Sequence, residues 1–498
     1  MKKSMFAIAA ISAAGLLTLV GCNGGSEDKV VNIMCWNTEF QERFEAFYPE
    51  FKETKKIDGV DYDILKDGTK VRFIIEANDN NNYQNKLDQK LKDQAKANAK
   101  DKIDMFLIEA DYATKYTSSD YTLDLKSKEV GLTDNDFKDQ YKYTQDIVTV
   151  NGKLKATSWQ ATPGLFAYRR DIAKEVLGFD DPAKVQEALA NWTKFDTVAA
   201  NMKAKGIKML SGFADNYRPY SNNMTGKWLD SDNKTVRLDP EIKKWIVSTK
   251  NYADNNYIGD NALWSAQWQA DQGPDGSKVE VKDDSGKVTS SVTAQKTFGF
   301  FYSTWGINFT LAGNADPNGY ATHMGDAKKE DGSIDTTKTL YGDYAVCQGP
   351  ASWYWGGSWL CAAKGSDDLP IVKDIMQKLT CDASIAEKIT RETQDYTNNK
   401  TAMDKLANDK TYGSEFLGGQ NHIALFKESA AKIDMSNAGP HDQTLNEGIQ
   451  NSFEAYFFPG NKTIDYKAAL KTFKDTVAEK ANNLTFSADW DSWDGKTL

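Results

Sequence analysis

The chain has 498 residues, with 61 Lys and Arg against 71 Asp and Glu, and a net charge of −10. Its hydrophobic content of 40% is typical of globular proteins, and its length allows roughly three domains. The excess of acidic residues disfavours a nucleic-acid-binding protein, because contacts to phosphates need clustered Lys and Arg side chains.

Residues 1–21 have the pattern of an export signal. A basic start at Lys2 and Lys3 precedes an apolar run over residues 5–20, which is shorter than the roughly 20 residues of a membrane span. The run ends in Leu19-Val20-Gly21-Cys22, which resembles a bacterial lipobox. This resemblance implies cleavage before Cys22, lipidation of Cys22, and anchoring outside the cytoplasmic membrane. The alternative is a plain secretory signal that is cut at another small residue. Residues 22–29 are a small, polar segment that we expect to be a flexible linker.

From residue 30 onward, short β-rich runs alternate with amphipathic helices. We expect strands at Val30–Trp36, Val71–Ile75 and Ile103–Ile108. The first crossover is expected to be a helix through Phe40, Phe44, Phe47 and Phe51, which Pro49 ends or kinks, and the second a helix through Tyr83, Leu87 and Leu91. This βαβαβ pattern predicts an α/β domain with a largely parallel sheet.

Aromatic and polar residues follow these predicted strands. The first strand leads into Trp36-Asn37-Thr38, and the third into Glu109-Ala110-Asp111-Tyr112. Ligands of parallel sheets bind outside the carboxyl ends of the strands, so these residues are candidate contacts. Neither G-x-x-x-x-G-K nor G-x-G-x-x-G is present at these positions, which disfavours a nucleotide, and we expect no cofactor.

A second lobe is expected to begin near Ala161. Strands are predicted at Leu165–Tyr168, Ile207–Gly212 and Thr297–Tyr302, and Gln272–Thr293 has the composition of a surface hairpin. A strand ending in Gly349-Pro350 precedes Trp353-Tyr354-Trp355-Gly356-Gly357-Ser358-Trp359, which we interpret as the return crossing. The remainder, from Ser366, has mostly helical periodicity.

Taken together, these features resemble the family 1 extracellular solute-binding proteins of ABC importers, the carbohydrate-binding type related to the maltose-binding protein. The most specific segment runs from Gly152 through Thr162-Pro163-Gly164-Leu165 to Asp171, supported by Tyr302-Ser303-Thr304-Trp305-Gly306 and Gly356-Gly357-Ser358-Trp359-Leu360. The resemblance implies an α/β, two-lobed, type II periplasmic-binding-protein-like fold, each lobe a mixed sheet flanked by helices, with the ligand cleft between the lobes.

The resemblance also implies a division of the chain and a set of partners. The N-terminal lobe is expected to comprise residues 30–160 and 346–395, and the C-terminal lobe residues 161–345 and 396–498, the last part helical. The implied function is capture of an oligosaccharide by a monomeric, lipid-anchored protein and its delivery to the transmembrane subunits of an ABC permease.

Carried over residue by residue, the resemblance implies ligand contacts at Trp36, Asn37, Asp111 and Trp159 on the N-terminal lobe, Asp215, Tyr217 and Trp305 on the other, and Trp353 and Trp355 at the return crossing. Asp442, at a predicted helix start near the C-terminus, is a tenth candidate contact. A sugar presents flat C–H faces and hydroxyls, which aromatic planes and carboxylates or amides recognise. The alternative for the five Trp residues in this set is a place in the hydrophobic core, and we expect three of the five to contact the ligand. Asp442 alternatively only favours a helix N-terminus. Trp192, Trp228, Trp245, Trp264 and Trp268 are interpreted as packing residues.

The rival function is a secreted, lipid-anchored glycoside hydrolase, which would also combine Trp platforms with two carboxylates. We expect no catalytic residue, since acid pairs have little specificity among 71 acids. The three histidines are scattered, so no metal site is expected. The spacing of the other cysteines matches no metal-binding motif; these are Cys35, Cys347, Cys361 and Cys381. Their apolar sequence neighbours favour buried free thiols, and disulfide bonds between them remain the alternative.

Overall fold

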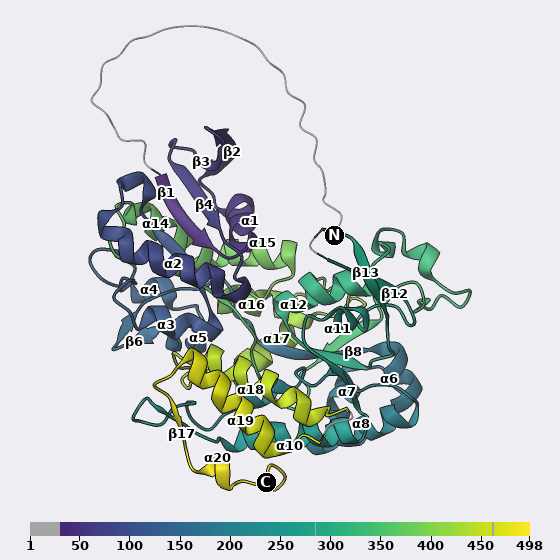
Figure 1. The fold of residues 1–498 in the computed structure, drawn as a ribbon. Helices are drawn as coiled ribbons and strands as arrows, with labels where there is room; N and C mark the ends of the chain where they lie inside the picture. The colour runs from purple at the N-terminus through teal and green to yellow at the C-terminus, as the bar shows by residue number, and fades with distance from the viewer. Residues whose placement is uncertain (1–29, 284, 461–462) are drawn as a thin grey trace, which may run out of the picture.

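The computed structural model describes residues 30–283, 285–460 and 463–498. The predicted export signal (1–21), the lipidation site Cys22 and the linker (22–29) lie outside the described residues. The chain forms two lobes, with the N-terminal sheet in the upper lobe of Figure 1 and the C-terminal helices in the lower one. Within the described ranges, no helix has the length and apolar character needed to cross a bilayer.

The N-terminal lobe is built on a six-stranded sheet with the order β16-β5-β1-β4-β3-β2. β1 (Val30–Cys35) pairs in parallel with β4 (Lys70–Ile75) on one side and with β5 (Met105–Glu109) on the other. α1 (Glu39–Phe47) and α2 (Asn82–Asp93) provide the crossovers. Every residue of β1 is buried, as expected for a central strand covered on both faces. The predicted βαβαβ unit is confirmed.

A β-hairpin interrupts the first crossover, which the sequence analysis missed. α1 ends at Phe47, and Phe51 opens β2 (Phe51–Ile57), which pairs with β3 (Val60–Leu65). The predicted extension of the helix to Phe51 is therefore wrong. Asp58 and Gly59 connect the strands with φ angles of 51° and 83°, the left-handed geometry of a tight hairpin turn. The rings of Phe51 and Phe44 still meet edge-to-face with centroids 6.1 Å apart, so Phe51 packs on the helix although it lies in a strand.

The second lobe contains a three-stranded antiparallel sheet and a separate parallel pair of strands. β8 (Gly164–Arg169) lies between β14 (Gly299–Ser303) and β15 (Tyr344–Cys347), antiparallel to both. An isolated parallel bridge between Lys208 and Thr297 connects this sheet to β9 (Leu210–Gly212). β9 in turn pairs in parallel with β11 (Ile258–Asn261). The flanking helices include α6 (Arg170–Leu177), α7 (Pro182–Ala188), α8 (Trp192–Ala204), α10 (Pro240–Asp254), α18 (Asp442–Phe457) and α19 (Tyr466–Lys480).

The chain returns to the N-terminal lobe at β16 (Ser358–Ala362), which pairs antiparallel with β5. α14 (Leu369–Met376) and α15 (Ala383–Thr393) follow, and α15 packs against α1. A bridge between Gln160 and Thr397 and one between Pro163 and Tyr354 place the connecting segments side by side. The division of the chain at 160, 345 and 395 stays a prediction.

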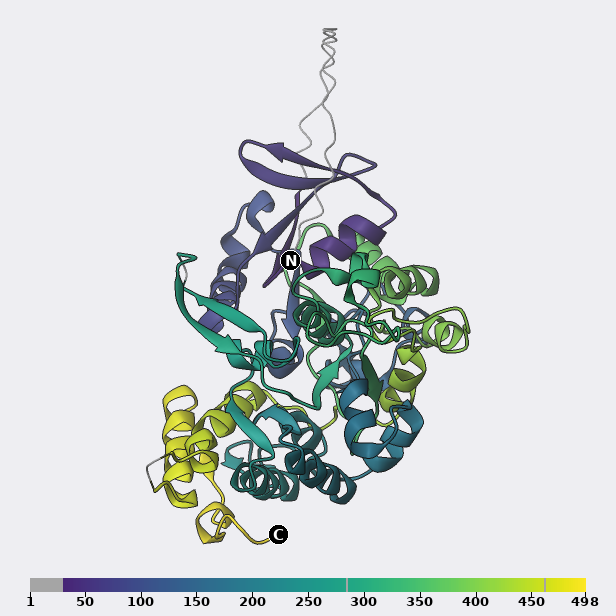
Figure 2. The same cartoon turned by 90° about the vertical axis from the view of Figure 1, so that its right-hand side faces the viewer.

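The segment 272–293 forms the predicted surface hairpin, with β12 (Lys278–Lys282) antiparallel to β13 (Val288–Thr293), and it projects from the molecule in Figure 2. Cys35, Cys347, Cys361 and Cys381 are free thiols. The remaining elements of four or more residues are α3 (Ala113–Thr117), α4 (Asp134–Phe137), α5 (Lys142–Asp146), α9 (Tyr217–Ser221), α11 (Ala266–Ala270), η5 (Ile307–Leu311), α13 (Ala312–Ala315), η7 (Met324–Ala327), η8 (Gln377–Cys381), α16 (Lys400–Ala407), α17 (His422–Ala430) and α20 (Asp489–Ser492). Shorter elements are η1 (Asp79–Asn81), η2 (Gln94–Lys96), η3 (Ala99–Asp101), η4 (Ala110–Tyr112), β6 (Thr149–Val150), β7 (Lys153–Leu154), β10 (Thr235–Val236), α12 (Thr304–Gly306), η6 (Tyr320–Thr322) and β17 (Thr485–Phe486).

Candidate functional site

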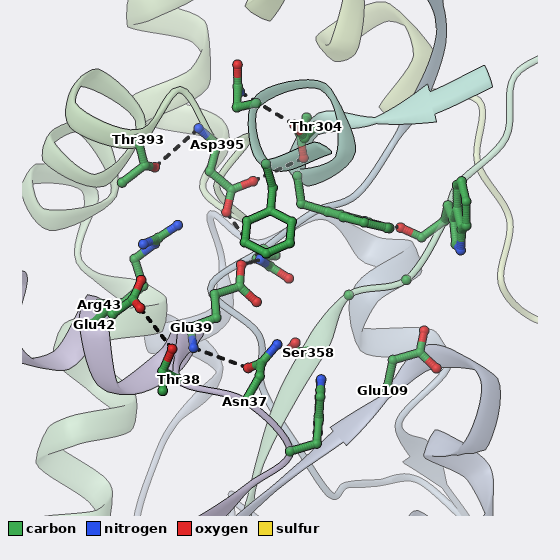
Figure 3. Close-up of a pocket in the computed structure, with 18 of the residues that line it drawn as sticks. Asn37, Thr38, Glu39, Glu42, Arg43, Glu109, Thr304, Ser358, Thr393 and Asp395 are labelled. Atoms are coloured by element: carbon green, nitrogen blue, oxygen red, sulfur yellow. Dashed lines mark hydrogen bonds between the residues drawn. The ribbon is translucent and has the colours of Figure 1, made fainter. Parts of the chain in front are cut away.

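A cavity of about 530 Å³, called the main cavity below, lies between the lobes at the carboxyl ends of β1, β5 and β14. This volume is in the range of small-molecule sites, roughly 300–1,000 Å³. The N-terminal lobe contributes the start of α1 and the exit of β5, and the second lobe contributes the segment after β14 (Figure 3). Its lining residues are Trp36, Asn37, Thr38, Glu39, Glu42, Arg43, Glu109, Asp111, Gln160, Thr304, Trp305, Asn308, Phe309, Trp355, Gly356, Gly357, Ser358, Thr393 and Asp395.

Aromatic side chains form one wall of the main cavity. Trp305 and Trp355 meet edge-to-face with ring centroids 5.2 Å apart, and the indole N–H of Trp305 donates to the carbonyl oxygen of Trp355 over 2.8 Å. Phe309 is 75% exposed, which is unusual for a large apolar side chain. Trp36, on the opposite lobe, is held edge-on by Tyr83 and Tyr112 behind it. The cavity therefore presents fixed aromatic surfaces from both lobes.

Trp264 extends this wall beyond the lining residues. Its ring stacks on Trp305 with centroids 6.0 Å apart and an interplanar angle of 19°, and it remains 47% exposed. Its backbone has a φ of 68°, a left-handed conformation that a bulky residue rarely adopts. Such strain is concentrated at functional positions, so Trp264 is a candidate contact despite its interpretation as a packing residue.

Polar groups from four segments also meet at the main cavity. The side-chain amide of Gln160 donates to Glu39 over 2.6 Å and to Asp395 over 3.2 Å. The hydroxyl of Thr304, from the second lobe, donates to the other oxygen of Asp395 over 3.0 Å. Burial, and then the nearby charge of Asp395, raise the pKa of Glu39 to about 7. Figure 3 shows Glu39, Thr304 and Asp395 converging from different elements.

A second group of charges lies at the exit of β5. The Arg218 guanidinium binds the Asp111 carboxylate through two hydrogen bonds of 2.7 and 2.5 Å. Glu109 accepts from the backbone N–H of Asp111 over 2.8 Å, and burial raises the pKa of Glu109 to about 8. The proximity of Asp111 and Glu109 raises the pKa of Arg218, so its charge is retained. The bidentate pair joins the two lobes.

Five of the ten predicted site residues line the main cavity: Trp36, Asn37, Asp111, Trp305 and Trp355. Asp442 lies in a neighbouring cavity, where burial raises its pKa to about 7. The structure thus brings six of the predicted residues to the region between the lobes. Contact of these residues with a ligand stays a prediction.

The structure places the other four predicted residues in the core. Trp159 is 2% exposed and packs on Phe40, and Tyr217 is fully buried with its hydroxyl donating to Asn446. Asp215 accepts from the indole N–H of Trp268 and from a backbone N–H, both over 2.7 Å, so its oxygens stabilise the strand exit. Trp353 lies against Gly164, where the absence of a side chain leaves room for its ring. Their burial explains why they do not line the main cavity.

Sequence reasoning missed several residues of the main cavity. Glu109 and Gln160 stand within segments already noted as a strand exit and a crossing, so their positions carried a usable signal. Asp395 follows α15, and Phe309 lies in the π-helical turn η5 (Ile307–Leu311), a local geometry that is frequent at functional sites. Neither feature has a sequence pattern that would single it out.

The described residues include one group of acids close enough to hold a cation, made of Asp104, Asp367 and Asp368. Both oxygens of Asp104 are already engaged, one by the backbone N–H of Asn32 at 2.9 Å and the other by the Ser366 hydroxyl at 2.6 Å. The group is not part of the main cavity. We assign no metal to it, since the oxygens of its buried member Asp104 already accept these hydrogen bonds.

No protein-family model and no curated protein sequence matches the chain. Solved structures do match its fold. An extracellular solute-binding protein of family 1 aligns over 90% of this chain and 99% of its own, with a TM-score of 0.63 and 13% identity. The binding protein associated with an ABC transporter from B. animalis subsp. lactis, in complex with beta-1,6-galactobiose, aligns over 93% and 100%, with a TM-score of 0.58 and 16% identity. The GacH receptor of Streptomyces glaucescens, solved unliganded and with acarbose, aligns over 92% and 99%, with a TM-score of 0.58 and 14% identity.

These alignments span almost the full length of each neighbour. The chain therefore has the two-lobed type II fold of periplasmic binding proteins, as expected from its sequence. Many of the structures that share this fold are sugar-binding proteins of ABC transporters.

Proposed function

We propose that the chain is an extracytoplasmic solute-binding protein that captures an oligosaccharide in the main cavity and delivers it to an ABC importer. The observation that carries this proposal is the cavity itself, where aromatic faces from both lobes and carboxylates of the N-terminal lobe line about 530 Å³. Neighbours of the same fold were solved with beta-1,6-galactobiose and with acarbose, which supports a sugar as the ligand class.

The chemistry of the main cavity fits a sugar ring. Trp36 and Trp305 offer flat apolar faces from opposite lobes, suited to the C–H faces of a pyranose. Glu39 and Asp395 offer acceptor oxygens for hydroxyl donors, and Arg43 offers donors for hydroxyl oxygens. A neutral polyhydroxylated ligand uses all of these groups without bringing a charge into a partly enclosed site.

Contacts between the lobes suggest how binding is coupled to closure. Thr304 of the second lobe donates to Asp395, and Arg218 of the second lobe donates to Asp111. An open form would bind the sugar mainly on one lobe, and hinge closure would add the contacts of the other. The sugar favours closure only through its extra affinity for the closed form. The closed protein would then dock on the transmembrane subunits of the permease as a monomer.

The proposed location rests on the sequence ahead of the described residues. Cleavage before Cys22 and lipidation of its thiol would tether the protein to the outer face of the cytoplasmic membrane, with residues 22–29 as the linker. Mass spectrometry of the membrane fraction tests this anchor: a diacylated N-terminal Cys22 is expected, and Cys22→Ser should release the chain into the medium.

A glycoside hydrolase is the alternative that the cavity raises, because Glu39 has a pKa of about 7 beside a second carboxylate, Asp395. The amide nitrogen of Gln160 lies between these two groups and donates to both. It occupies the space in which a glycosidic bond would have to lie between an acid and a nucleophile. We therefore assign no bond-making role to either carboxylate.

Titration calorimetry of residues 26–498 against a panel of plant and starch oligosaccharides tests the proposed function. Thin-layer chromatography of the same mixtures after overnight incubation is run in parallel. The proposal expects binding of one oligosaccharide series, with the sugar recovered intact. Hydrolysis of a panel member would favour the glycosidase, and absence of binding to the whole panel would contradict the sugar as ligand.

A further inference from the structure

Asp111 lines the main cavity and pairs with Arg218, which lines only the second cavity described below. Asp111 lies on η4 (Ala110–Tyr112), directly after β5 of the N-terminal lobe, and Arg218 lies on α9 (Tyr217–Ser221) of the second lobe. Their side chains are only 22% and 14% exposed, and two parallel hydrogen bonds of 2.7 and 2.5 Å join them. When the lobes are closed, as in this structure, a bidentate pair in such a place is a bar between them.

Two smaller cavities continue on the far side of this bar. The second cavity, of about 40 Å³, is lined by both Asp111 and Arg218, while Asp111 also lines the main cavity. The third cavity, of about 150 Å³, shares Asn222, Tyr354 and Asn437 with the second. The second cavity thus adjoins the main cavity at Asp111 and the third cavity at Asn222, Tyr354 and Asn437, so the ion pair stands between the main cavity and the other two.

The lining beyond the bar suits the same class of ligand as the main cavity. Asn222, Asn437 and Asp442 provide amide and carboxylate groups, and Tyr354 provides an aromatic ring. Tyr354 and Trp355 are consecutive in the chain, yet Tyr354 lines the second cavity and Trp355 lines the main cavity. The return crossing therefore supplies one aromatic residue to each side of the bar.

We propose that the Asp111–Arg218 pair is the end wall of the main cavity and sets the greatest length of oligosaccharide that the protein accepts. This inference rests on the proposed function. A neutral sugar hydroxyl cannot replace either partner of a bidentate ion pair, since displacement would leave one poorly exposed charge unpaired. A sugar chain that reaches the pair stops there, and the polar groups of the second and third cavities remain unused.

The test measures the affinity for oligosaccharides of increasing length, all of the linkage that the wild type binds. In the wild type, affinity is expected to stop rising at one length. The double variant Asp111→Ala/Arg218→Ala removes both partners of the bar together, and its ratio of long-chain to short-chain affinity is expected to rise at least tenfold. The loss of Asp111 can weaken the binding of every oligosaccharide in the series, and the ratio of long-chain to short-chain affinity cancels this common loss. An unchanged length profile in this variant would overturn the inference.

Gln443→Ala is the matched control. The side-chain amide of Gln84 donates a hydrogen bond to Gln443 over 3.0 Å, and this bond also joins the two lobes. Neither residue lines any of the three cavities. Its length profile is expected to equal that of the wild type. A gain for long chains in Gln443→Ala as well would show that looser lobes, and not the removed wall, admit them, and would contradict the inference.

A crystal structure of the wild type with the longest bound member provides a second test that needs no variant. The terminal ring is expected to lie against Asp111 and Arg218. A sugar chain that passes the intact pair and reaches Asn437 would overturn the inference while leaving the proposed function standing. If no oligosaccharide of any length binds, the proposed function fails, and the inference fails with it.

Discussion

Replacing Glu39 by Gln is expected to stabilise the protein at neutral and alkaline pH and to leave it unchanged in acid. Burial and the charge of Asp395 raise the pKa of Glu39 from its ordinary value of 4.5 to about 7. The ionised carboxylate therefore opposes folding. A pKa change of this size corresponds to about 3 kcal/mol, and because Glu39 is half-buried at a solvent-filled cavity we expect about 1–2 kcal/mol.

The sign of this effect follows from proton linkage. Below pH 4.5 the group is protonated in both the folded and the unfolded chain, so its charge has no effect on stability. The stability cost grows as the pH rises from 4.5 to about 7, and it is complete above that. Gln at this position keeps a carbonyl oxygen that can accept from Gln160, so the hydrogen bond is retained without the charge.

Urea unfolding of the wild type and of Glu39→Gln, at about pH 5 and about pH 8, measures the effect through the transition midpoint. Glu42→Gln is the matched control, because Glu42 lies on the same helix and in the same cavity but is exposed. The variant midpoint should exceed the wild-type midpoint at the higher pH, with a smaller difference at the lower one. An equal difference at both pH values, or destabilisation at the higher pH, would refute the reasoning.

Three other substitutions test separate parts of the structure. Trp305→Ala should weaken sugar binding about tenfold in calorimetry, which is near 1.5 kcal/mol, while Trp305→Phe should keep most of the affinity. Equal affinity of the wild type and both variants would exclude a stacking role for Trp305. Gly164→Ala places a methyl group 2.1 Å from the ring of Trp353 and should lower the free energy of unfolding by about 3 kcal/mol, measured as a lower Tm. Gly313→Ala is the control, because Gly313 has open space around it, and its Tm should be unchanged or higher. A wild-type Tm for Gly164→Ala would contradict the packing described. Asp275→Ala removes one of the two carboxylates that bind Arg169, whose side chain is fully buried, and leaves Asp171 as its partner. It should cost about 2 kcal/mol in chemical unfolding, an effect that a loss below about 0.5 kcal/mol would rule out.

The sequence predicted the parts of the fold that local patterns determine. β1 and β5 were evident as short apolar runs, and the face of α2 with Tyr83 and Leu87 followed helical spacing. The hairpin β2–β3 was missed because the spacing of Phe44, Phe47 and Phe51 imitates one helical face. The dipeptide Asp58-Gly59, between segments of alternating polarity, was the signal that would have identified it.

The site was most predictable where its residues follow a strand directly. Trp36 and Asp111 come straight after β1 and β5, so the sheet alone places them at the cavity. Trp353 and Trp355 stand two residues apart in the same segment, yet one is buried and the other lines the cavity, because packing against Gly164 takes the first ring inward. Such a choice depends on the other lobe, which no local pattern describes.

The same limit applies to the polar side of the main cavity. Glu39, Gln160 and Asp395 are far apart in the chain, and they meet only because the crossings and α15 pack beside α1. An acidic residue among 71 is not distinguishable by type alone. Chemistry that is assembled from three distant segments is therefore visible in the structure and not in the sequence.

The crystal structure of the chain with the oligosaccharide that binds best in the panel tests the central claim most directly. We expect a sugar ring lying against Trp305 and Trp36 in the main cavity, intact, with hydroxyl groups within hydrogen-bond distance of Glu39 or Asp395. A sugar bound elsewhere, or a cleaved product lying between Glu39 and Asp395, would contradict the account.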